Sequence, residues 1–154
     1  MDNTQLNEYS RRFADVLFAA HPEWREFVSV DTTEGVGEGA LLVEISPAQP
    51  RDIKGPLYIS TDDAEITVGF DIYHSHFNGY ADDDEAEAFA AALAFIADIV
   101  AERIAVISWW DGDEWRGSSS IIKGEAAGTP SWARNAKTAR IRSWRGTYDK
   151  DIAV

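Results

Sequence analysis

The segment best suited to chemistry runs from Asp71 to Tyr80, where two histidines follow an aspartate. Its sequence, Asp-Ile-Tyr-His-Ser-His-Phe-Asn-Gly-Tyr, places His74 and His76 two residues apart. On an extended chain such side chains point the same way, and two imidazoles with a carboxylate form a common three-ligand metal site. A small metal-dependent enzyme centred on Asp71, His74 and His76 is therefore one hypothesis. The spacing is also common without a metal, and continued strand alternation favours partly buried, hydrogen-bonded imidazoles or a strand that ends in a bulge.

Other catalytic chemistry finds little support in the sequence. The chain has no cysteine, which excludes a disulfide framework and a cysteine-built zinc site. No serine lies in the strained strand-to-helix turn of a nucleophile elbow, and no oxyanion loop is visible. We therefore predict no catalytic residue and no cofactor.

A helix and a hairpin follow the histidines. Apolar residues recur at three- and four-residue spacings from Phe89 to Val100, which predicts a helix with one buried stripe. Acidic residues precede it, where aspartate caps backbone N–H groups and negative charge meets the positive end of the helix dipole. Two strand-like runs, Ile104 to Trp110 and Glu114 to Ile122, are joined by the turn dipeptide Asp111-Gly112 and should pair antiparallel.

The rest of the chain alternates between strand patterns and one further helix. An amphipathic helix is predicted from about Thr4 to Ala20. The predicted strands are Phe27 to Asp31, Leu41 to Ile45, Leu57 to Ser60, Ile66 to Tyr73 and Thr138 to Tyr148. We therefore expect an α+β fold, with two main helices packed on a mostly antiparallel sheet of about six or seven strands. Its 154 residues suit a single compact domain, 1–154.

Charge is the most informative bulk property. The net charge is −13, and residues 1–100 carry 20 acidic and 5 basic side chains, against 7 and 9 in residues 101–154. Such a body repels nucleic acid and anionic lipid and attracts basic partners. No run reaches the roughly 18 apolar residues of a membrane span, and no signal peptide is visible, so a cytoplasmic location is expected. Alternatively, the acidic composition serves to keep the protein soluble, in a host that is saline or has an acidic proteome.

The C-terminal segment is the basic exception. Its cationic and aromatic side chains are Arg134, Lys137, Arg140, Arg142, Trp144, Arg145, Tyr148 and Lys150. Such a set can form a nucleic-acid strip, but the acidity of the rest of the chain favours cross-strand pairing with the acidic hairpin.

Trp109 and Trp110 are adjacent in a predicted strand, so they face opposite ways and cannot share one core. One of them is expected at a surface or groove, where tryptophan is enriched in interface hot spots. Packing under the first helix or the last strand is the alternative. A ligand-binding domain with a tryptophan-lined pocket is a third functional class.

The segment from Ile66 to Ile121 resembles a known family. Phe-Asp-Ile-Tyr-His-Ser-His-Phe, an alanine-rich helix and then Val-Ile-Ser-Trp-Trp-Asp-Gly-Asp-Glu-Trp-Arg-Gly-Ser-Ser look like the small acidic immunity proteins of bacterial polymorphic or contact-dependent toxin systems. The resemblance implies a non-enzymatic inhibitor that binds a cognate toxin domain and occludes its active site. It implies no catalytic residue and does not explain the basic C-terminal strand.

Together, charge and resemblance predict a partner-binding surface for a basic toxin. Its expected residues are Asp82, Asp83, Asp84, Glu85, Glu87, Trp110, Asp111, Asp113 and Glu114.

Overall fold

A computed structural model describes residues 5–79 and 84–154. Its contacts divide the chain into two compact units. Unit 1 comprises the described residues up to Ser46, Pro56–Gly69 and His74–Ile96; unit 2 comprises Pro47–Gly55, Phe70–Tyr73 and Ala97–Val154. Each unit is described by itself below.

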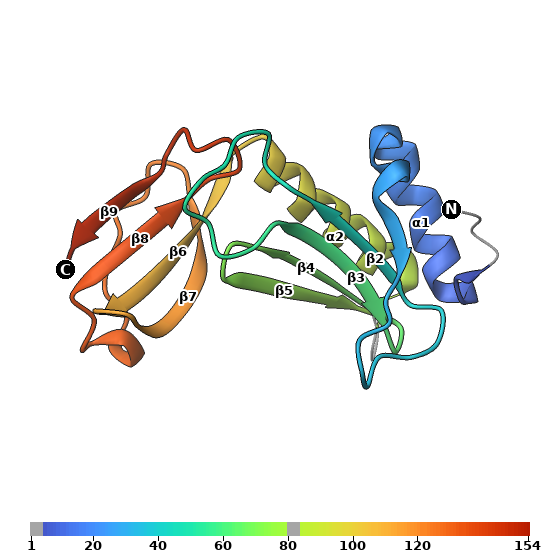
Figure 1. Cartoon of the computed structure of the whole chain (residues 1–154), viewed down its shortest axis with the longest axis horizontal. Helices are drawn as coiled ribbons and strands as arrows, with labels where there is room; N and C mark the ends of the chain where they lie inside the picture. Colours follow the sequence, from blue (N-terminus) through green and yellow to red (C-terminus); the bar gives the residue numbers. More distant parts are fainter. Residues whose placement is uncertain (1–4, 80–83) are drawn as a thin grey trace. The chain divides into compact units, whose positions relative to one another are not determined.

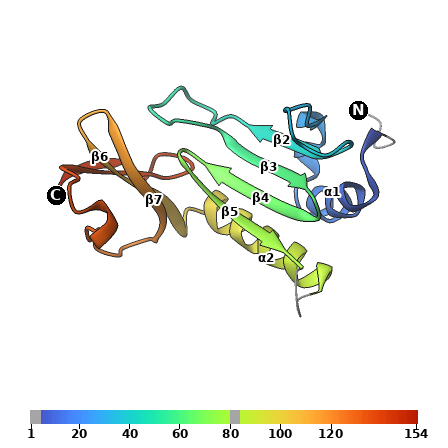
Figure 2. The same ribbon diagram turned by 90° about the horizontal axis from the view of Figure 1, so that it is seen from below.

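The described residues form two α-helices, two 3-10 helices and nine strands (Figures 1 and 2). In chain order these are α1 (Glu8–Ala20), η2 (Pro22–Phe27), β1 (Val28–Val30), β2 (Leu41–Ile45), β3 (Leu57–Asp62), β4 (Glu65–Phe70), β5 (Tyr73–Asn78), α2 (Glu85–Val100), β6 (Ile104–Asp111), β7 (Glu114–Ile122), η3 (Ser131–Ala133), β8 (Thr138–Arg142) and β9 (Lys150–Ala153). Among these residues, no helix is long and apolar enough to cross a membrane.

The α+β class is confirmed, but the single sheet of six or seven strands is wrong. The strands form two antiparallel sheets, with the orders β1-β2-β3-β4-β5 and β7-β6-β8-β9. Two predicted strands each contain a turn that the alternation pattern did not reveal. The run from Ile66 is interrupted at Asp71, and the run from Thr138 ends at Arg142.

Both interruptions are stabilised by distant parts of unit 2. Asp71 has a positive φ of 56°, and its carboxylate accepts a hydrogen bond from the Lys54 backbone N–H at 2.6 Å. Aspartate tolerates this left-handed conformation better than most residues. After β8, the Arg51 guanidinium donates to the carbonyl oxygens of Ser143 and Trp144 at 2.6 and 2.5 Å. These contacts stabilise turns where local alternation predicts strand.

Unit 1 packs α1 and part of α2 with the five-stranded sheet. The Asn7 side chain caps α1 by accepting from the Ser10 N–H at 2.9 Å. Apolar side chains of α1 are fully buried, and the Phe13 ring packs edge-on against Phe89 of α2 with centroids 5.1 Å apart. Phe77 of β5 lies against Phe95 of α2 at 5.6 Å. Aromatic contacts therefore join α2 to both α1 and the sheet.

A buried polar contact links α1 to the same sheet. The Ser10 and Thr61 hydroxyl oxygens lie 2.5 Å apart, and Thr61 also accepts from the Leu41 N–H at 2.9 Å. These residues are at most 1% exposed. A buried donor that loses its acceptor destabilises the fold. The Thr61 hydroxyl therefore helps to hold α1, β2 and β3 together.

We expect Thr61→Val to lower the free energy of unfolding by about 1–3 kcal/mol, since it leaves the Leu41 N–H and the Ser10 hydroxyl without this partner. Urea unfolding followed by circular dichroism measures the change. Thr67→Val is the matched control, because the Thr67 hydroxyl pairs with an exposed histidine side chain, and should stay within about 0.5 kcal/mol. Equal losses in the two variants would contradict the role of Thr61.

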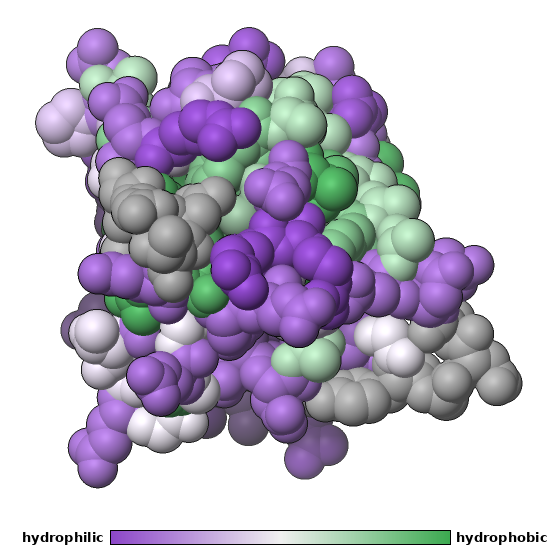
Figure 3. Space-filling model, turned by 90° about the vertical axis from the view of Figure 1, so that its right-hand side faces the viewer, coloured by the Kyte–Doolittle hydropathy of each residue, from purple (hydrophilic) through white to green (hydrophobic). Residues whose placement is uncertain are grey.

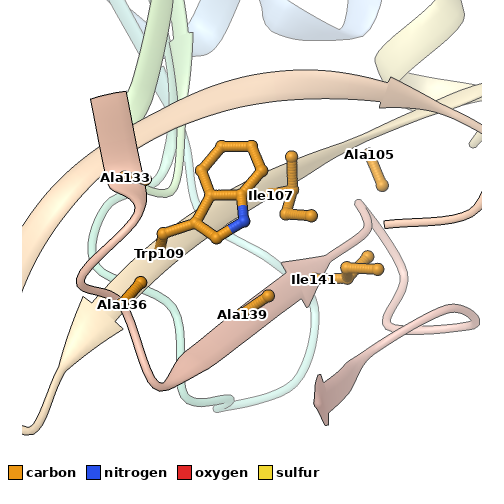
Figure 4. Close-up of a cluster of buried hydrophobic side chains, with 7 residues drawn as sticks. All are labelled: Ala105, Ile107, Trp109, Ala133, Ala136, Ala139 and Ile141. Carbon is orange, nitrogen blue, oxygen red and sulfur yellow. The ribbon is translucent and has the colours of Figure 1, made fainter. Parts of the chain in front are cut away.

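Unit 2 is built on the β6–β7 hairpin, which was predicted to within one residue. Gly112 takes a positive φ of 60° in the predicted turn. One face of the sheet carries a cluster of buried side chains centred on Trp109 (Figure 4). Its members are Ala105, Ile107, Trp109, Ala133, Ala136, Ala139 and Ile141. Several of them are alanines, so Trp109 provides the bulk of this small core.

The opposite face of the same sheet buries charge. Arg140 and Arg142 are 8% and 5% exposed. Arg142 contacts Asp151 at 2.8 Å and Asp52 at 3.3 Å, and Arg140 contacts Asp52 at 3.3 Å. The pKa of Asp52 is lowered, chiefly by the charge of Arg140. The predicted basic strip is therefore not an exposed surface at these arginines, and their acidic partners are not those of the β6–β7 hairpin.

Glu102 is a buried carboxylate in the same unit, 3% exposed. It accepts from the backbone N–H groups of Arg145 at 2.8 Å and Thr147 at 3.3 Å. Burial alone would raise its pKa, but hydrogen bonds from Thr147, Ser143 and the Arg145 backbone outweigh it and lower the pKa of Glu102 to about 2. Glu102 therefore stabilises the turn after β8 in its ionised form.

A lowered pKa in the folded state means that the unfolded chain takes up the proton first as pH falls. Glu102 should therefore contribute on the order of 3 kcal/mol above about pH 5, and lose this contribution between about pH 5 and pH 2. In urea unfolding experiments at a series of pH values, the free energy of unfolding should fall less steeply with decreasing pH for Glu102→Gln than for the wild type. Glu44→Gln, which removes an exposed carboxylate, should keep the wild-type slope. An unchanged slope in Glu102→Gln would refute this account.

Candidate partner-binding surfaces

The acidic segment before and within α2 is described from Asp84 onward; Asp82 and Asp83 lie outside the described residues. The Asp84 carboxylate caps α2 by accepting from the Glu87 N–H at 2.8 Å. Glu85 is held by Arg12 through two contacts of 2.7 and 2.8 Å. The hydrogen bond from Arg12 lowers the pKa of Glu85. Glu87 is exposed. The segment therefore contains both a carboxylate that is paired with an arginine and one that is open to solvent.

The hairpin between β6 and β7 also contains both paired and exposed carboxylates. Asp111 contacts Lys137 at 2.6 Å and Arg116 at 3.4 Å, and the Lys137 hydrogen bond lowers the pKa of Asp111. Glu114 lies 2.8 Å from Arg116. Asp113 is exposed at the turn. Within the part of the chain that the structure describes, no ion pair is recorded for Asp113, nor for Asp84 or Glu87.

The two adjacent tryptophans face opposite ways, as predicted. Trp109 is 5% exposed and lies in the buried cluster. Trp110 is half-buried on the other face, with the Lys54 ammonium 5.4 Å and the Arg140 guanidinium 5.5 Å from its ring centre. Its indole N–H donates to the Ser108 hydroxyl at 2.8 Å. These intramolecular contacts do not favour Trp110 as the exposed anchor that the sequence analysis expected.

We expect Lys137→Ala to raise the pKa of Asp111 toward its ordinary value, because the variant removes the cation that stabilises the ionised carboxylate. Carboxyl-carbon NMR titration of Asp111 measures this directly. Lys150→Ala removes a lysine of the same unit that does not contact Asp111 and should leave the Asp111 titration unchanged. No movement in Lys137→Ala would show that the pair does not form in solution.

His74 and His76 are exposed, so of the two expectations for them, partly buried imidazoles or an interrupted strand, the partial burial is not found. The turn at Asp71 ends β4, and both histidines instead lie on β5, the edge strand of its sheet. His76 Nδ1 lies 2.7 Å from Glu65 Oε1 and 3.0 Å from the Thr67 hydroxyl. Across residues 5–79 and 84–154, no group of three or more histidine, aspartate or glutamate side chains is placed to hold a metal ion.

Unit 1 concentrates the acidity of the chain. The sequence assigned to it carries 17 acidic and 3 basic side chains, against 10 and 11 in unit 2. Glu8, Asp62 and Asp63 line a hollow of about 630 Å³ in this unit. Figure 3 shows a face that is largely hydrophilic, with a smaller hydrophobic area. The unit therefore presents a strongly negative surface.

Unit 2 contains a hollow of a different kind, about 460 Å³ in volume. Trp109 and Trp132 are among its lining residues, and their rings meet edge to face, with centroids 5.1 Å apart. Trp132 rests over Gly117, where any larger side chain would overlap its ring. A tryptophan-lined pocket was one hypothesis from the sequence, without named residues. The Asp111-Gly112 turn alone would place Arg116 opposite Trp109, but a register shift between Trp109 and Trp110 brings Gly117 there instead.

Comparisons with protein-family models, curated proteins and solved structures give no match.

Proposed function

We propose that this chain is a cytoplasmic immunity protein, which binds a cognate, basic bacterial toxin domain and occludes its active site without a cofactor. The observation that carries the proposal is the excess of carboxylates in unit 1, 17 against 3 basic side chains. The resemblance of Ile66 to Ile121 to acidic immunity proteins indicates the kind of partner.

The basic side chains of unit 1 cannot neutralise its surface. Arg12 contacts both Glu8 at 2.9 Å and Glu85 at 2.7 Å. Arg25 lies over the Phe18 ring, 5.3 Å from its centre. An excess charge of this size accelerates encounter with an oppositely charged protein and selects against acidic partners.

The competing hypothesis, a metal-dependent enzyme, has weaker geometric support. Asp71 uses its carboxylate to accept the Lys54 N–H, and His76 contacts Glu65 and Thr67. In the ranges that the structure covers, these residues form no three-ligand group. Metal analysis of untagged protein tests this alternative, since stoichiometric metal would favour it.

Two double variants separate the effect of long-range attraction to the toxin from the effect of direct contact with it. Glu87→Gln with Asp113→Asn neutralises two carboxylates that form no ion pair within residues 5–79 and 84–154. Glu85→Gln with Glu114→Gln neutralises the same number in the same segments, but these carboxylates already contact arginines. Because both double variants change the net charge equally, both should slow association with the toxin several-fold and reduce its salt dependence.

Only the first double variant should also accelerate dissociation, because its carboxylates are available to the partner. Stopped-flow association and surface-plasmon-resonance dissociation with the product of the adjacent upstream gene measure the two rates. Association that is unaffected by either double variant would refute acidic steering. Equal dissociation rates would refute direct contact through Glu87 and Asp113.

A further inference from the structure

Strand β5 forms one edge of the five-stranded sheet of unit 1. It ends the order β1-β2-β3-β4-β5, so its outer side pairs with no other strand in the described part of the chain. Figures 1 and 2 show β5 at the margin of the sheet. Such an edge presents a row of backbone N–H and C=O groups, which is a template for a further strand.

The β4–β5 hairpin determines which backbone groups face outward. A two-residue turn joins Phe70 to Tyr73, and the contacts of Thr67 with His76 and of Glu65 with Asn78 agree with that register. The residue after such a turn bonds back across it, and bonded residues then alternate along the strand.

This alternation separates two sets of residues on β5. Ser75 and Phe77 direct their backbone groups toward β4, as Tyr73 does, whereas His74 and His76 direct theirs toward the outer edge. The His76 side chain contacts Thr67 and Glu65 of β4. It therefore lies toward the neighbouring strand and leaves the outer side of its own backbone accessible.

The sequence of β5 lacks the features that usually prevent edge pairing. Tyr-His-Ser-His-Phe-Asn contains no lysine, arginine, aspartate, glutamate or proline, although charged side chains and proline protect many edge strands. The other edge strands differ, since β1 has only three residues, β9 contains Lys150 and Asp151, and β7 contains Glu114 and Arg116. Of the described edges, β5 is therefore the best suited to accept a strand.

A hollow of about 390 Å³ lies between β5 and α2, within unit 1. It is lined by His76 and Phe77 of β5 and by Glu87, Ala88 and Ala91 of α2, among others. Because neighbouring strand residues point to opposite faces, a hollow that both His76 and Phe77 line lies at the edge of the sheet rather than under one face. The small alanines of α2 leave room there for an additional strand.

The charge around this edge favours a basic strand. Glu87 is exposed and forms no ion pair with any residue that the structure describes, and unit 1 carries 17 acidic and 3 basic side chains. A second copy of the chain would bring the same negative charge to the edge, so repulsion opposes pairing of β5 with itself. Lysine or arginine on the added strand would instead be attracted.

We propose that β5 accepts an extended, basic segment of the partner protein as a sixth strand, which lies beside α2 and bonds to the outward backbone groups of His74 and His76. The inference rests on the proposed function, because it takes the toxin as the source of the strand. Strand addition of this kind obtains affinity from backbone hydrogen bonds and specificity from the side chains on alternate positions.

The edge is tested without the partner by NMR titration of the isotope-labelled full chain with acetyl-Lys-Val-Lys-Val-Lys-Val-amide. We expect the backbone amide signals of His74 and His76 to move downfield, since their N–H groups gain acceptors, and those of Ser75 and Phe77 to move less. Acetyl-Lys-Pro-Lys-Pro-Lys-Pro-amide has the same charge but is a poor strand former, and should not cause this shift. Equal shifts with both peptides, or none with the first, overturn the proposal.

Two further comparisons separate backbone pairing from side-chain and charge effects. His76→Pro removes an outward N–H, which an edge strand tolerates, and should weaken binding of the lysine–valine peptide at least about tenfold. His76→Ala keeps the N–H and should change binding less than about threefold. Equal effects of the two variants, or equal binding of acetyl-Glu-Val-Glu-Val-Glu-Val-amide, would overturn addition of a basic strand. The wild-type amide shifts remain a test even where the proline variant does not fold.

Hydrogen exchange tests the added strand in the complex with the product of the adjacent upstream gene. The His74 and His76 amides should exchange at least about tenfold more slowly in the complex, because exchange then requires a hydrogen bond to open. The Ser75 and Phe77 amides, which face β4 in the free chain, are the internal reference and should change less.

These experiments distinguish failure of strand addition from failure of the proposed function. A complex that leaves the exchange of His74 and His76 unchanged overturns strand addition and leaves the immunity function standing. Absence of any complex overturns the immunity function, and the peptide titration then decides alone whether β5 accepts a basic strand. A dimer of this chain that His76→Pro dissociates would identify a second copy as the occupant and overturn the basic partner.

Discussion

A charge can be buried only when an opposite charge or several hydrogen bonds accompany it, and unit 2 is organised by this constraint. Arg142, 5% exposed, lies between Asp52 and Asp151. Glu102, 3% exposed, holds the backbone of the turn after β8. Asp71, Glu102, Arg140 and Arg142 of this unit are buried, and its 10 acidic and 11 basic side chains nearly cancel.

The net charge of the chain is concentrated in unit 1. Its arginines are few, and Arg12 alone contacts two glutamates. The two units therefore offer different chemistry to a partner. Unit 1 offers long-range attraction for a basic surface, while unit 2 offers an uncharged hollow beside Trp109 and Trp132. The proposed function uses the acidic surface of unit 1 to promote encounter with a basic partner.

Local patterns predicted much of the fold and less of the site. The β2 and β7 boundaries agree with the sequence prediction, because alternation and the Asp111-Gly112 turn are local signals. The turn at Asp71 depends on the Lys54 backbone, 17 residues away, and the turn after β8 depends on Arg51, about 90 residues away. These long-range side-chain contacts leave no periodic signal. The contact of Lys137 with Asp111, 26 residues apart, is instead an instance of the pairing expected between the basic C-terminal segment and the acidic hairpin.

The measurement that tests the central claim most directly is titration of this protein with the product of the adjacent upstream gene at two salt concentrations. A tight 1:1 complex that weakens as salt rises is the predicted result, since screening reduces attraction between exposed charges. Absence of a complex, or an affinity independent of salt, would contradict the proposal that an acidic surface recognises a basic toxin.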